Sequence, residues 1–217
     1  MKEFSFKTIE NFDAHIEASV PNYAHIHELI LSMSTYFLSP DSVANDLGCS
    51  SGLLIDKLDR YQNDKSITYN GFELEKHIIE ERYFRGNKMV IIGDVTKKEL
   101  PKNSLTLSIF LLQFLSKEKR LPLLKNVYNS LEDGGALIIT EKTYEESGLM
   151  QEIFTFSYYD LKLKAFTAQE ILEKQKTLRK IQKPLTAKEN EKMFREVGFN
   201  PHQFYQSLGF RGWICLK

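Results

Sequence analysis

The segment Asp46–Gly52 reads Asp-Leu-Gly-Cys-Ser-Ser-Gly and lies between an apolar stretch (42–47) and a helix-like stretch (52–61). Glycines between a strand and a helix let backbone N–H groups and the helix N-terminus approach a polar or anionic ligand. The dinucleotide-binding fingerprint has a second glycine where this chain has Ser50, so D-x-G-x-x-x-G stands in place of G-x-G-x-x-G. The segment therefore predicts a ligand-binding turn of the nucleotide-binding type.

Two more acidic residues follow predicted strands, each at the strand's carboxyl end. Glu73 comes about 20 residues after Gly52, the spacing at which an acid binds the ribose hydroxyls in nucleotide-binding folds. Asp94 follows the next predicted strand. Together with Asp46, these carboxylates around one glycine turn predict an adenosine-type pocket. The alternative for each acid is that it caps the helix that follows it.

A serine hydrolase is the second interpretation of the same turn. Gly48-x-Ser50-x-Gly52 fits a nucleophile elbow, with His202 and an acid completing a triad. However, the elbow would follow the first predicted strand, which leaves too little sheet before it to supply an oxyanion loop. His202 also follows Pro201 at the start of a predicted hairpin. We therefore favour the nucleoside pocket.

A parallel sheet is expected to position these residues, because strand-like and helix-like stretches alternate from residue 42 to residue 140. Strands are predicted at 42–47, 67–72, 89–92, 105–111 and 136–140, and helices at 52–61, 76–85 and 117–131. The last of these helices is followed by the stop signal Asp133-Gly134-Gly135. Repeated strand–helix–strand units imply a doubly wound α/β sheet with helices on both faces.

The pattern changes after Thr140. Residues 145–197 are almost entirely helix-compatible, with one break at Lys183-Pro184. The stretches 203–208 and 211–216, separated by Gly209-Phe210, predict a β-hairpin. Because no linker interrupts the chain, we expect one domain over residues 1–217. It should have a Rossmann-like sheet, a helical cap insertion at about 145–197 and a C-terminal β-hairpin.

The composition argues against several classes of protein. The 217 residues carry 29 basic and 29 acidic side chains, so no overall field favours nucleic acid. The two cysteines, Cys49 and Cys215, fit neither a disulfide framework nor a zinc motif, which predicts a reducing, cytoplasmic location. The longest apolar stretch, 105–115, is shorter than the ~20 residues of a membrane span. We expect no metal, no membrane and no direct nucleic acid binding.

The turn Asp46–Gly52, together with Glu73 and Asp94, resembles the cofactor site of the class I S-adenosylmethionine-dependent methyltransferases. A closer resemblance, to the carboxy-S-adenosylmethionine synthase branch of that superfamily, covers most of the chain. It rests on Ser19-Val20-Pro21-Asn22-Tyr23, Leu112-Gln113-Phe114-Leu115, Gly134-Gly135-Ala136-Leu137, Glu141-Lys142 and Val197-Gly198-Phe199. This resemblance implies a seven-stranded methyltransferase sheet and a homodimer.

The resemblance also implies S-adenosylmethionine as the cofactor, S-adenosylhomocysteine as the product, and a role for each site residue. Glu73 would accept both ribose hydroxyls, Asp94 would accept the adenine amino group, and Tyr23 would close the pocket from the N-terminal side. The cofactor-binding residues implied in this way are Tyr23, Asp46, Gly48, Ser50, Gly52, Glu73, Leu74, Asp94, Val95 and Ile109.

Two reactions are compatible with the resemblance. We expect methyl transfer to a small-molecule acceptor, with no general base singled out among Tyr158, Tyr159 and Glu141. The alternative is synthesis of carboxy-S-adenosylmethionine from S-adenosylmethionine and prephenate, which serves modification of the tRNA wobble uridine. The synthase branch has a Lys-Arg pair whose arginine holds the extra carboxylate, and this chain has Lys174-Gln175 there. Because glutamine brings no charge, we expect a preference for plain S-adenosylmethionine.

Residues 162–195 hold ten basic and four acidic side chains in an otherwise acidic chain. One interpretation is a solvated amphipathic helix pair. The other is an anionic partner, which could be a carboxylate substrate, RNA or a second subunit. We favour the solvated helices. A non-catalytic subunit that binds the cofactor without turnover is the third functional class.

Overall fold

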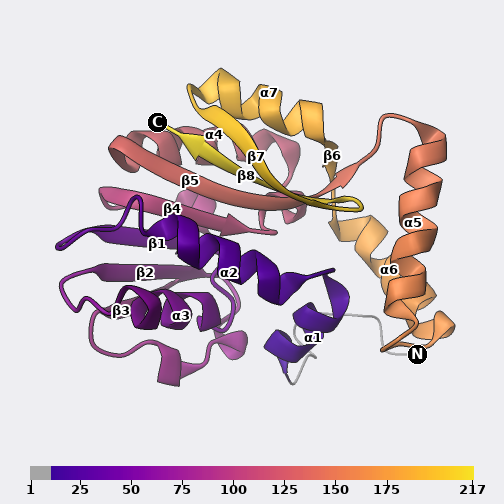
Figure 1. Ribbon diagram of the computed structural model, residues 1–217, viewed down its shortest axis with the longest axis horizontal. Helices are drawn as coiled ribbons and strands as arrows, with labels where there is room; N and C mark the ends of the chain where they lie inside the picture. The colour runs from indigo at the N-terminus through magenta and orange to yellow at the C-terminus, as the bar shows by residue number, and fades with distance from the viewer. Residues whose placement is uncertain (1–10) are drawn as a thin grey trace.

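The computed structural model of the chain describes residues 11–217. A central sheet runs through it in the order β3-β2-β1-β4-β5-β8-β7, and the short β6 pairs with the end of β5 (Figure 1). The strands are β1 (Val43–Leu47), β2 (Thr68–Glu73), β3 (Lys88–Ile92), β4 (Asn103–Ile109), β5 (Leu131–Tyr144), β6 (Leu185–Thr186), β7 (Asn200–Ser207) and β8 (Phe210–Leu216). Strands β1 to β5 pair in parallel, whereas β8 runs antiparallel to both β5 and β7.

Helices cover both faces of this sheet. The described chain forms the helices α1 (Phe12–Ser19), α2 (Tyr23–Ser34), α3 (Leu53–Gln62), α4 (Lys117–Ser130), α5 (Gly148–Lys162), α6 (Ala168–Ile181) and α7 (Ala187–Val197). It also has the 3₁₀ turns η2 (Lys76–Ile78), η3 (Glu81–Tyr83), η4 (Val95–Lys97) and η5 (Leu112–Phe114). Apolar side chains of α2 and α3 share a core with Ala44 and Leu105 of the sheet. Those of α4 and α7 share a second core with Leu137 and Trp213. The sheet is therefore doubly wound, with a core on each face.

The predicted fold class is confirmed. Every predicted strand is present with shifted ends, and the hairpin forms around Gly209. The apolar spacing at 52–61 produces α3, whose Leu54, Ile55 and Leu58 are buried against the sheet. Because β1 to β5 are parallel, their carboxyl ends meet at one edge of the sheet.

The helix predicted at 76–85 is wrong, because this segment forms the separate 3₁₀ turns η2 and η3. Between them, the Glu80 N–H donates to the Ser51 carbonyl oxygen at 3.0 Å, outside its own segment. A helix of this length is marginal on its own in water. A tertiary hydrogen bond therefore outweighs the helical propensity of the segment.

Two predicted boundaries are also wrong. β5 begins at Leu131, directly after α4, and runs through Asp133–Gly135 with a register irregularity against β4. The segment 145–197 has two breaks rather than one, because Thr167 starts a new helix as the N-cap of a capping box. Its last helix, α7, packs with α4, so α5 and α6 are the helices that stand beyond the end of the sheet (Figure 1).

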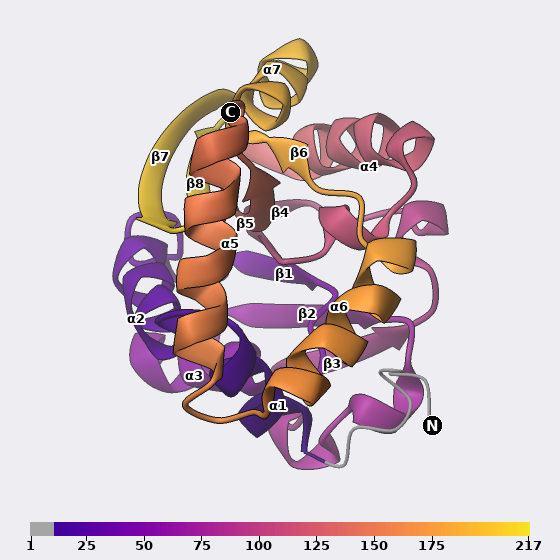
Figure 2. The ribbon, with the colours of Figure 1, turned by 90° about the vertical axis from the view of Figure 1, so that its right-hand side faces the viewer.

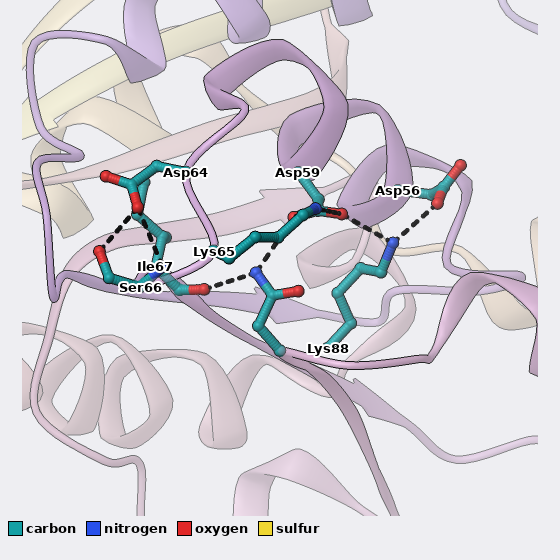
Figure 3. A network of polar contacts seen from close by, with 8 residues as sticks. Asp56, Asp59, Asp64, Lys65, Ser66, Ile67 and Lys88 are labelled. Atoms are coloured by element: carbon teal, nitrogen blue, oxygen red, sulfur yellow. Dashed lines mark hydrogen bonds and ion pairs between the residues drawn. The ribbon is translucent and has the colours of Figure 1, made fainter.

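A buried ionic network fixes β3 to α3 (Figure 3). The Lys88 ammonium lies 2.9 Å from Oδ1 of Asp56 and 3.0 Å from Oδ2 of Asp59, and none of these side chains is more than 9% exposed. Asn87 and Lys65 also donate to Asp59. Although burial raises the pKa of Asp59, these hydrogen bonds hold it below its ordinary value. The network thus positions β3, whose carboxyl end lies at the edge where ligands bind in such sheets.

Helices α5 and α6 stand across the carboxyl ends of the central strands (Figure 2). The Tyr158 hydroxyl of α5 donates to the Ser19 carbonyl oxygen at the end of α1, at 2.6 Å. Lys174 of α6 donates to Oγ of the same serine at 2.8 Å. These contacts join α1, α5 and α6 into one layer that faces the strand ends. Within residues 11–217, no helix is long and apolar enough to cross a membrane.

Candidate functional site

A cavity of about 410 Å³ lies at the carboxyl edge of the sheet, within the ~300–1,000 Å³ typical of small-molecule sites. The β1–α3 turn and the ends of β2, β3 and β4 form one wall, and α1, α5 and α6 form the other. Predicted cofactor-binding residues that line the cavity are Gly48, Ser50, Glu73, Leu74, Asp94, Val95 and Ile109. The parallel topology therefore brings most of the predicted site residues together, as expected for this edge of a doubly wound sheet.

The β1–α3 turn has an unusual backbone conformation. Gly48, Ser50 and Gly52 have φ angles of 73°, 51° and 93°, all in the left-handed region. At Gly52, a Cβ would lie 2.4 Å from Cε2 of Phe84, so a larger residue would require the Phe84 ring to move. Ser50 stands where the dinucleotide fingerprint has glycine, and holding it in this conformation costs about 1–3 kcal/mol. Its N–H donates to Glu73 at 2.9 Å, which offsets part of that cost.

Glu73 ends β2, and its carboxylate is fixed by backbone N–H groups. Oε2 accepts from Ser50 at 2.9 Å, and Oε1 accepts from Leu74 at 2.8 Å and from Glu75 at 2.9 Å. Because a carboxylate has about four acceptor positions, capacity for a further donor remains. Burial raises the pKa of Glu73, and the backbone donors oppose that rise. Such a fixed acceptor at a cavity wall can bind a hydroxyl group of a ligand.

Asp94 caps the turn that follows β3, as the alternative interpretation of the strand-end acids predicted. Its Oδ1 accepts from the N–H of Thr96 at 3.0 Å and from the hydroxyl of the same residue at 2.7 Å. Its Oδ2 accepts from Lys119 at 3.2 Å. The hydroxyl of Thr96 is the main cause that holds the pKa of Asp94 below its ordinary value. Asp94 also lines the cavity, so the cap and a ligand-binding role are compatible.

Tyr23, Asp46 and Gly52 lie outside the cavity lining found among residues 11–217. Tyr23 packs against His27, with the ring centroids 4.4 Å apart. Gly52 is the N-cap of α3, behind the turn. Asp46 is buried in β1, and burial together with the charge of Glu73 raises its pKa to about 7. A cation bound near this pair of acids would favour their ionised forms.

The opposite end of the cavity carries amine, imidazole and aromatic side chains, of which only Tyr158 was considered for a role in the site from the sequence alone. Lys142 of β5, Tyr158 of α5, Lys174 of α6 and His15 of α1 line it. Burial lowers the pKa of His15 to about 4, so its ring is neutral at pH 7 and its Nε2 can accept a hydrogen bond from the Lys174 ammonium 2.6 Å away. One signal was available in the sequence, because Lys142 comes shortly after the strand predicted at 136–140, at the same sheet edge as Glu73.

The residues considered as general bases are engaged elsewhere. Tyr158 lines the cavity, but its hydroxyl donates to the end of α1. The two oxygens of Glu141 accept the N–H groups of Leu112 and Gln113, each at 2.8 Å, and burial raises the pKa of this carboxyl to about 8. Tyr159 lies outside the cavity lining of the described chain. Tyr158 and Glu141 are therefore already hydrogen-bonded within the fold.

The serine hydrolase interpretation is wrong. Ser50 follows the central strand β1, whereas His202 lies on the edge strand β7, with β4, β5 and β8 between them. The side chain of His202 is exposed. A nucleophile and its base must lie within hydrogen-bond reach, which this separation prevents.

Comparison with known proteins places the whole chain in a family. The carboxy-S-adenosyl-L-methionine synthase of Staphylococcus epidermidis is 31% identical over 217 residues, which cover 98% of this chain and 95% of that protein. The chain belongs to the carboxy-S-adenosyl-L-methionine synthase family. The synthase of this name from Methylococcus capsulatus is 29% identical, over 95% of this chain and 89% of that protein. The one from Vibrio vulnificus is 27% identical, over 99% of this chain and 91% of that protein. No protein-family model matches the chain. The resemblance predicted from the sequence is confirmed.

Solved structures similar to this synthase family member include several methyltransferases. An O-methyltransferase family protein from Burkholderia thailandensis aligns with a TM-score of 0.65 at 11% identity, over 94% of this chain and 59% of that chain. Human N-acetylserotonin methyltransferase, solved with S-adenosylmethionine, aligns with a TM-score of 0.57 at 15% identity, over 89% and 54%. A chain of the complex between the Haloferax volcanii Trm112 methyltransferase activator and a methyltransferase aligns with a TM-score of 0.64 at 13% identity. The alignment covers 89% of this chain and 90% of that chain. At these identities the likeness shows the fold alone.

In this member of the synthase family, Lys174-Gln175 stand where the resemblance implies a Lys-Arg pair. Gln175 is 9% exposed, lies outside the cavity lining, and its Nε2 has no hydrogen-bond partner among residues 11–217. Lys176 and Arg179, the nearby cations on α6, are exposed and also lie outside the lining. Lys174, in contrast, lines the cavity. The cation that α6 supplies to the cavity is therefore Lys174.

Proposed function

We propose that this protein is a carboxy-S-adenosylmethionine synthase that binds S-adenosylmethionine at the strand ends and transfers a carboxyl group to it from prephenate. A C–H bond of the methyl group is replaced by a C–C bond to the carboxylate. Prephenate loses its ring carboxyl group and its hydroxyl group, the latter leaving with the methyl proton as water, and its ring becomes aromatic. The observation that carries the proposal is the Glu73 carboxylate, which backbone N–H groups hold at the cavity wall. Family membership supports the reaction, because relatives that match nearly the full chain bear the name of this synthase.

The residues of the turn and the strand ends fit S-adenosylmethionine in position and charge. Glu73 would accept the ribose hydroxyls, and Asp94 and Val95 would border the adenine. The backbone of Gly48 and Ser50 would approach the methionine part. The bound ligand supplies a methyl carbon already activated by its sulfonium. The protein therefore needs chiefly to orient two substrates and exclude water.

Methyl transfer to a small-molecule acceptor is the second candidate, and Gln175 favours it. At this position the resemblance implies an arginine that holds the extra carboxylate of the carboxylated product. Glutamine brings neither the charge nor the bidentate fork of arginine. A methyltransferase, which releases S-adenosylhomocysteine, has no extra carboxylate to hold there.

Product analysis separates these candidates. The purified protein is incubated with S-adenosylmethionine and prephenate, and the small molecules are identified by mass spectrometry. We expect a carboxylated sulfonium product. S-Adenosylhomocysteine together with a methylated acceptor would support methyl transfer instead. A protein that binds S-adenosylhomocysteine in calorimetry but turns over neither substrate would be a non-catalytic binding subunit.

We also propose that the protein forms a homodimer through the outer face of α5. Leu149, Ile153 and Phe156 lie at i, i+4 and i+7 on one side of this helix and are 68%, 45% and 65% exposed. Grouped exposed apolar side chains of this kind mark interfaces. Light scattering should give twice the monomer mass for the wild type and the monomer mass for Phe156→Glu. A monomeric wild type would exclude this dimer.

A cytoplasmic location is part of the proposal. Cys49 and Cys215 are buried and free, which suits a reducing compartment. Cell fractionation should recover the protein with cytoplasmic enzymes. Recovery from the culture medium or with membranes would contradict this location.

A further inference from the structure

Three lysines converge on aromatic rings at the basic end of the cavity. The Lys142 ammonium lies 5.4 Å from the ring centroid of Tyr158, and the Lys162 ammonium lies 5.5 Å from the same centroid. Lys162 and Lys174 lie 5.2 Å and 5.9 Å from the ring centroid of Phe166. Lys142 and Lys174 line the cavity, whereas Lys162 is buried beside them with 2% of its surface exposed.

Lys142 and Lys162 lie in an environment that lacks negative charge. No carboxylate of residues 11–217 forms an ion pair with either ammonium, and aromatic rings are their close neighbours. Burial lowers the pKa of each lysine to about 8, and the charge of Lys162 adds to the effect on Lys142. A buried charge without a partner destabilises a fold. Two such ammonium groups around one ring at a cavity therefore indicate that a bound anion completes the site.

The side chain of Lys174 is held in place at the same end. Its Nζ lies 2.8 Å from Oγ of Ser19 and 2.6 Å from Nε2 of His15. Both neighbours are neutral at pH 7, because burial lowers the pKa of His15 to about 4. These two neighbours orient the amine. Burial and then the charges of Lys162 and Lys142 lower the pKa of Lys174 to about 7, and a bound anion would favour its charged form.

We propose that Lys142, Lys162 and Lys174 form the binding site for a carboxylate of the second substrate. Lys142 and Lys174 would contact this carboxylate, and Lys162 would strengthen the positive field beside them. The inference rests on the proposed function and extends it, because it assigns the side chains that select an organic acid. In this chain, the lysines then supply the positive charge that the neutral Gln175 does not.

The opposite charges of the two cavity ends support this assignment. Glu73 lines the turn end, next to the buried Asp46 of β1, and a cationic sulfonium ligand is expected there. The lysines lie at the other end, on β5, α5 and α6. Complementary charges at separate ends would hold a cation and an organic acid in a defined orientation, which a two-substrate reaction requires.

Calorimetry on the full-length protein tests this site. The protein is saturated with S-adenosylhomocysteine and titrated with prephenate. The site variants are Lys142→Met and Lys162→Met, which keep most of the apolar stem, and the matched control is Lys164→Met, an exposed lysine two residues from Lys162. We expect the control to bind prephenate like the wild type and each site variant to bind it about ten- to a hundredfold more weakly. All four proteins should bind S-adenosylhomocysteine equally.

Thermal stability gives a second measurement, which distinguishes a lysine that binds the substrate from one that only stabilises the fold. Because Lys162 is buried without a carboxylate partner in the described chain, Lys162→Met should raise the melting temperature of the ligand-free protein. Its affinity for prephenate should fall at the same time. A lower melting temperature with unchanged prephenate affinity would show that Lys162 serves the fold alone, and would overturn the inference.

The calorimetric outcomes distinguish failure of this inference from failure of the proposed function. If S-adenosylhomocysteine gives no heat with the wild type, the proposed function is wrong. If it binds but prephenate does not bind, the anion site and carboxyl transfer from prephenate are both wrong, while cofactor binding stands. Equal prephenate affinities for the wild type, Lys142→Met and Lys162→Met would also overturn the anion site.

Discussion

Replacing Glu73 by glutamine removes a charge from the cavity wall while nearly preserving the size of the side chain. The carboxylate now accepts N–H groups from Ser50, Leu74 and Glu75, and we propose that it also accepts from the ribose. A hydrogen bond to a charged group contributes about 1.5–3 kcal/mol. Loss of one such bond predicts a dissociation constant for S-adenosylmethionine that is about 10 to 150 times higher.

The same substitution should also weaken the turn. Glutamine has one oxygen acceptor and one NH₂ donor, so either Ser50 or the pair Leu74 and Glu75 loses an acceptor. A buried donor left unpaired costs about 1–3 kcal/mol of unfolding free energy. Calorimetric titration well below the melting temperature of each protein separates this loss of stability from the loss of affinity.

Glu80→Gln is the matched control for this experiment. Glu80 lies in the same segment, its side chain is 51% exposed, and it pairs at 3.7 Å with Arg82 rather than lining the cavity. We expect the control to bind S-adenosylmethionine like the wild type. Equal affinities of the wild type and a folded Glu73→Gln would refute Glu73 as the ribose ligand. Equal losses in both variants would indicate a general charge effect.

Three further substitutions and one control substitution test other parts of the structure. Burial raises the pKa of Asp46 from 3.8 to about 7, so the folded state keeps a proton that the unfolded chain releases. As the pH rises from 3.8 to about 7, the unfolding free energy of the wild type should therefore fall relative to that of Asp46→Asn. Urea titrations should show a fall of up to about 1.4 kcal/mol per pH unit. Lys88→Met leaves two buried aspartates without their shared cation and should destabilise the fold by about 3–5 kcal/mol. Lys65→Met, at a lysine 72% exposed, should cost at most about 1 kcal/mol in the same chemical unfolding assay. Gln175→Arg should shift preference toward the carboxylated cofactor by up to about a hundredfold in a competition assay. An unchanged ratio would show that residue 175 does not reach the ligand.

Local patterns were sufficient to predict the sheet and one wall of the cavity. Alternating strand-like and helix-like stretches fix a parallel sheet, and a parallel sheet brings its carboxyl ends to one edge. Glu73 and Asp94 could therefore be placed at the same site from their positions after two strands. The left-handed conformation of Ser50 could not be predicted, because the Ser50 N–H donates to Glu73, which lies at the end of another strand, β2.

The other wall could not be predicted, because it is built by contacts between distant parts of the chain. Tyr158 and Ser19, whose hydrogen bond joins α5 to α1, are 139 residues apart. His15 and Lys174 are 159 residues apart. No local periodicity encodes such pairs. The wrong prediction of a helix at 76–85 has the same cause. A hydrogen bond from the Glu80 N–H to the carbonyl oxygen of Ser51, in a distant segment, decides the conformation there.

Conversion of S-adenosylmethionine in the presence of prephenate tests the proposed function most directly. The purified protein is mixed with both compounds, with Glu73→Gln under the same conditions as the comparison, and the sulfonium compounds are followed by mass spectrometry. We expect the wild type to deplete S-adenosylmethionine and accumulate its carboxylated form, and the variant to do so much more slowly. A wild type that binds S-adenosylmethionine in calorimetry but leaves it unchanged with prephenate would contradict the synthase assignment.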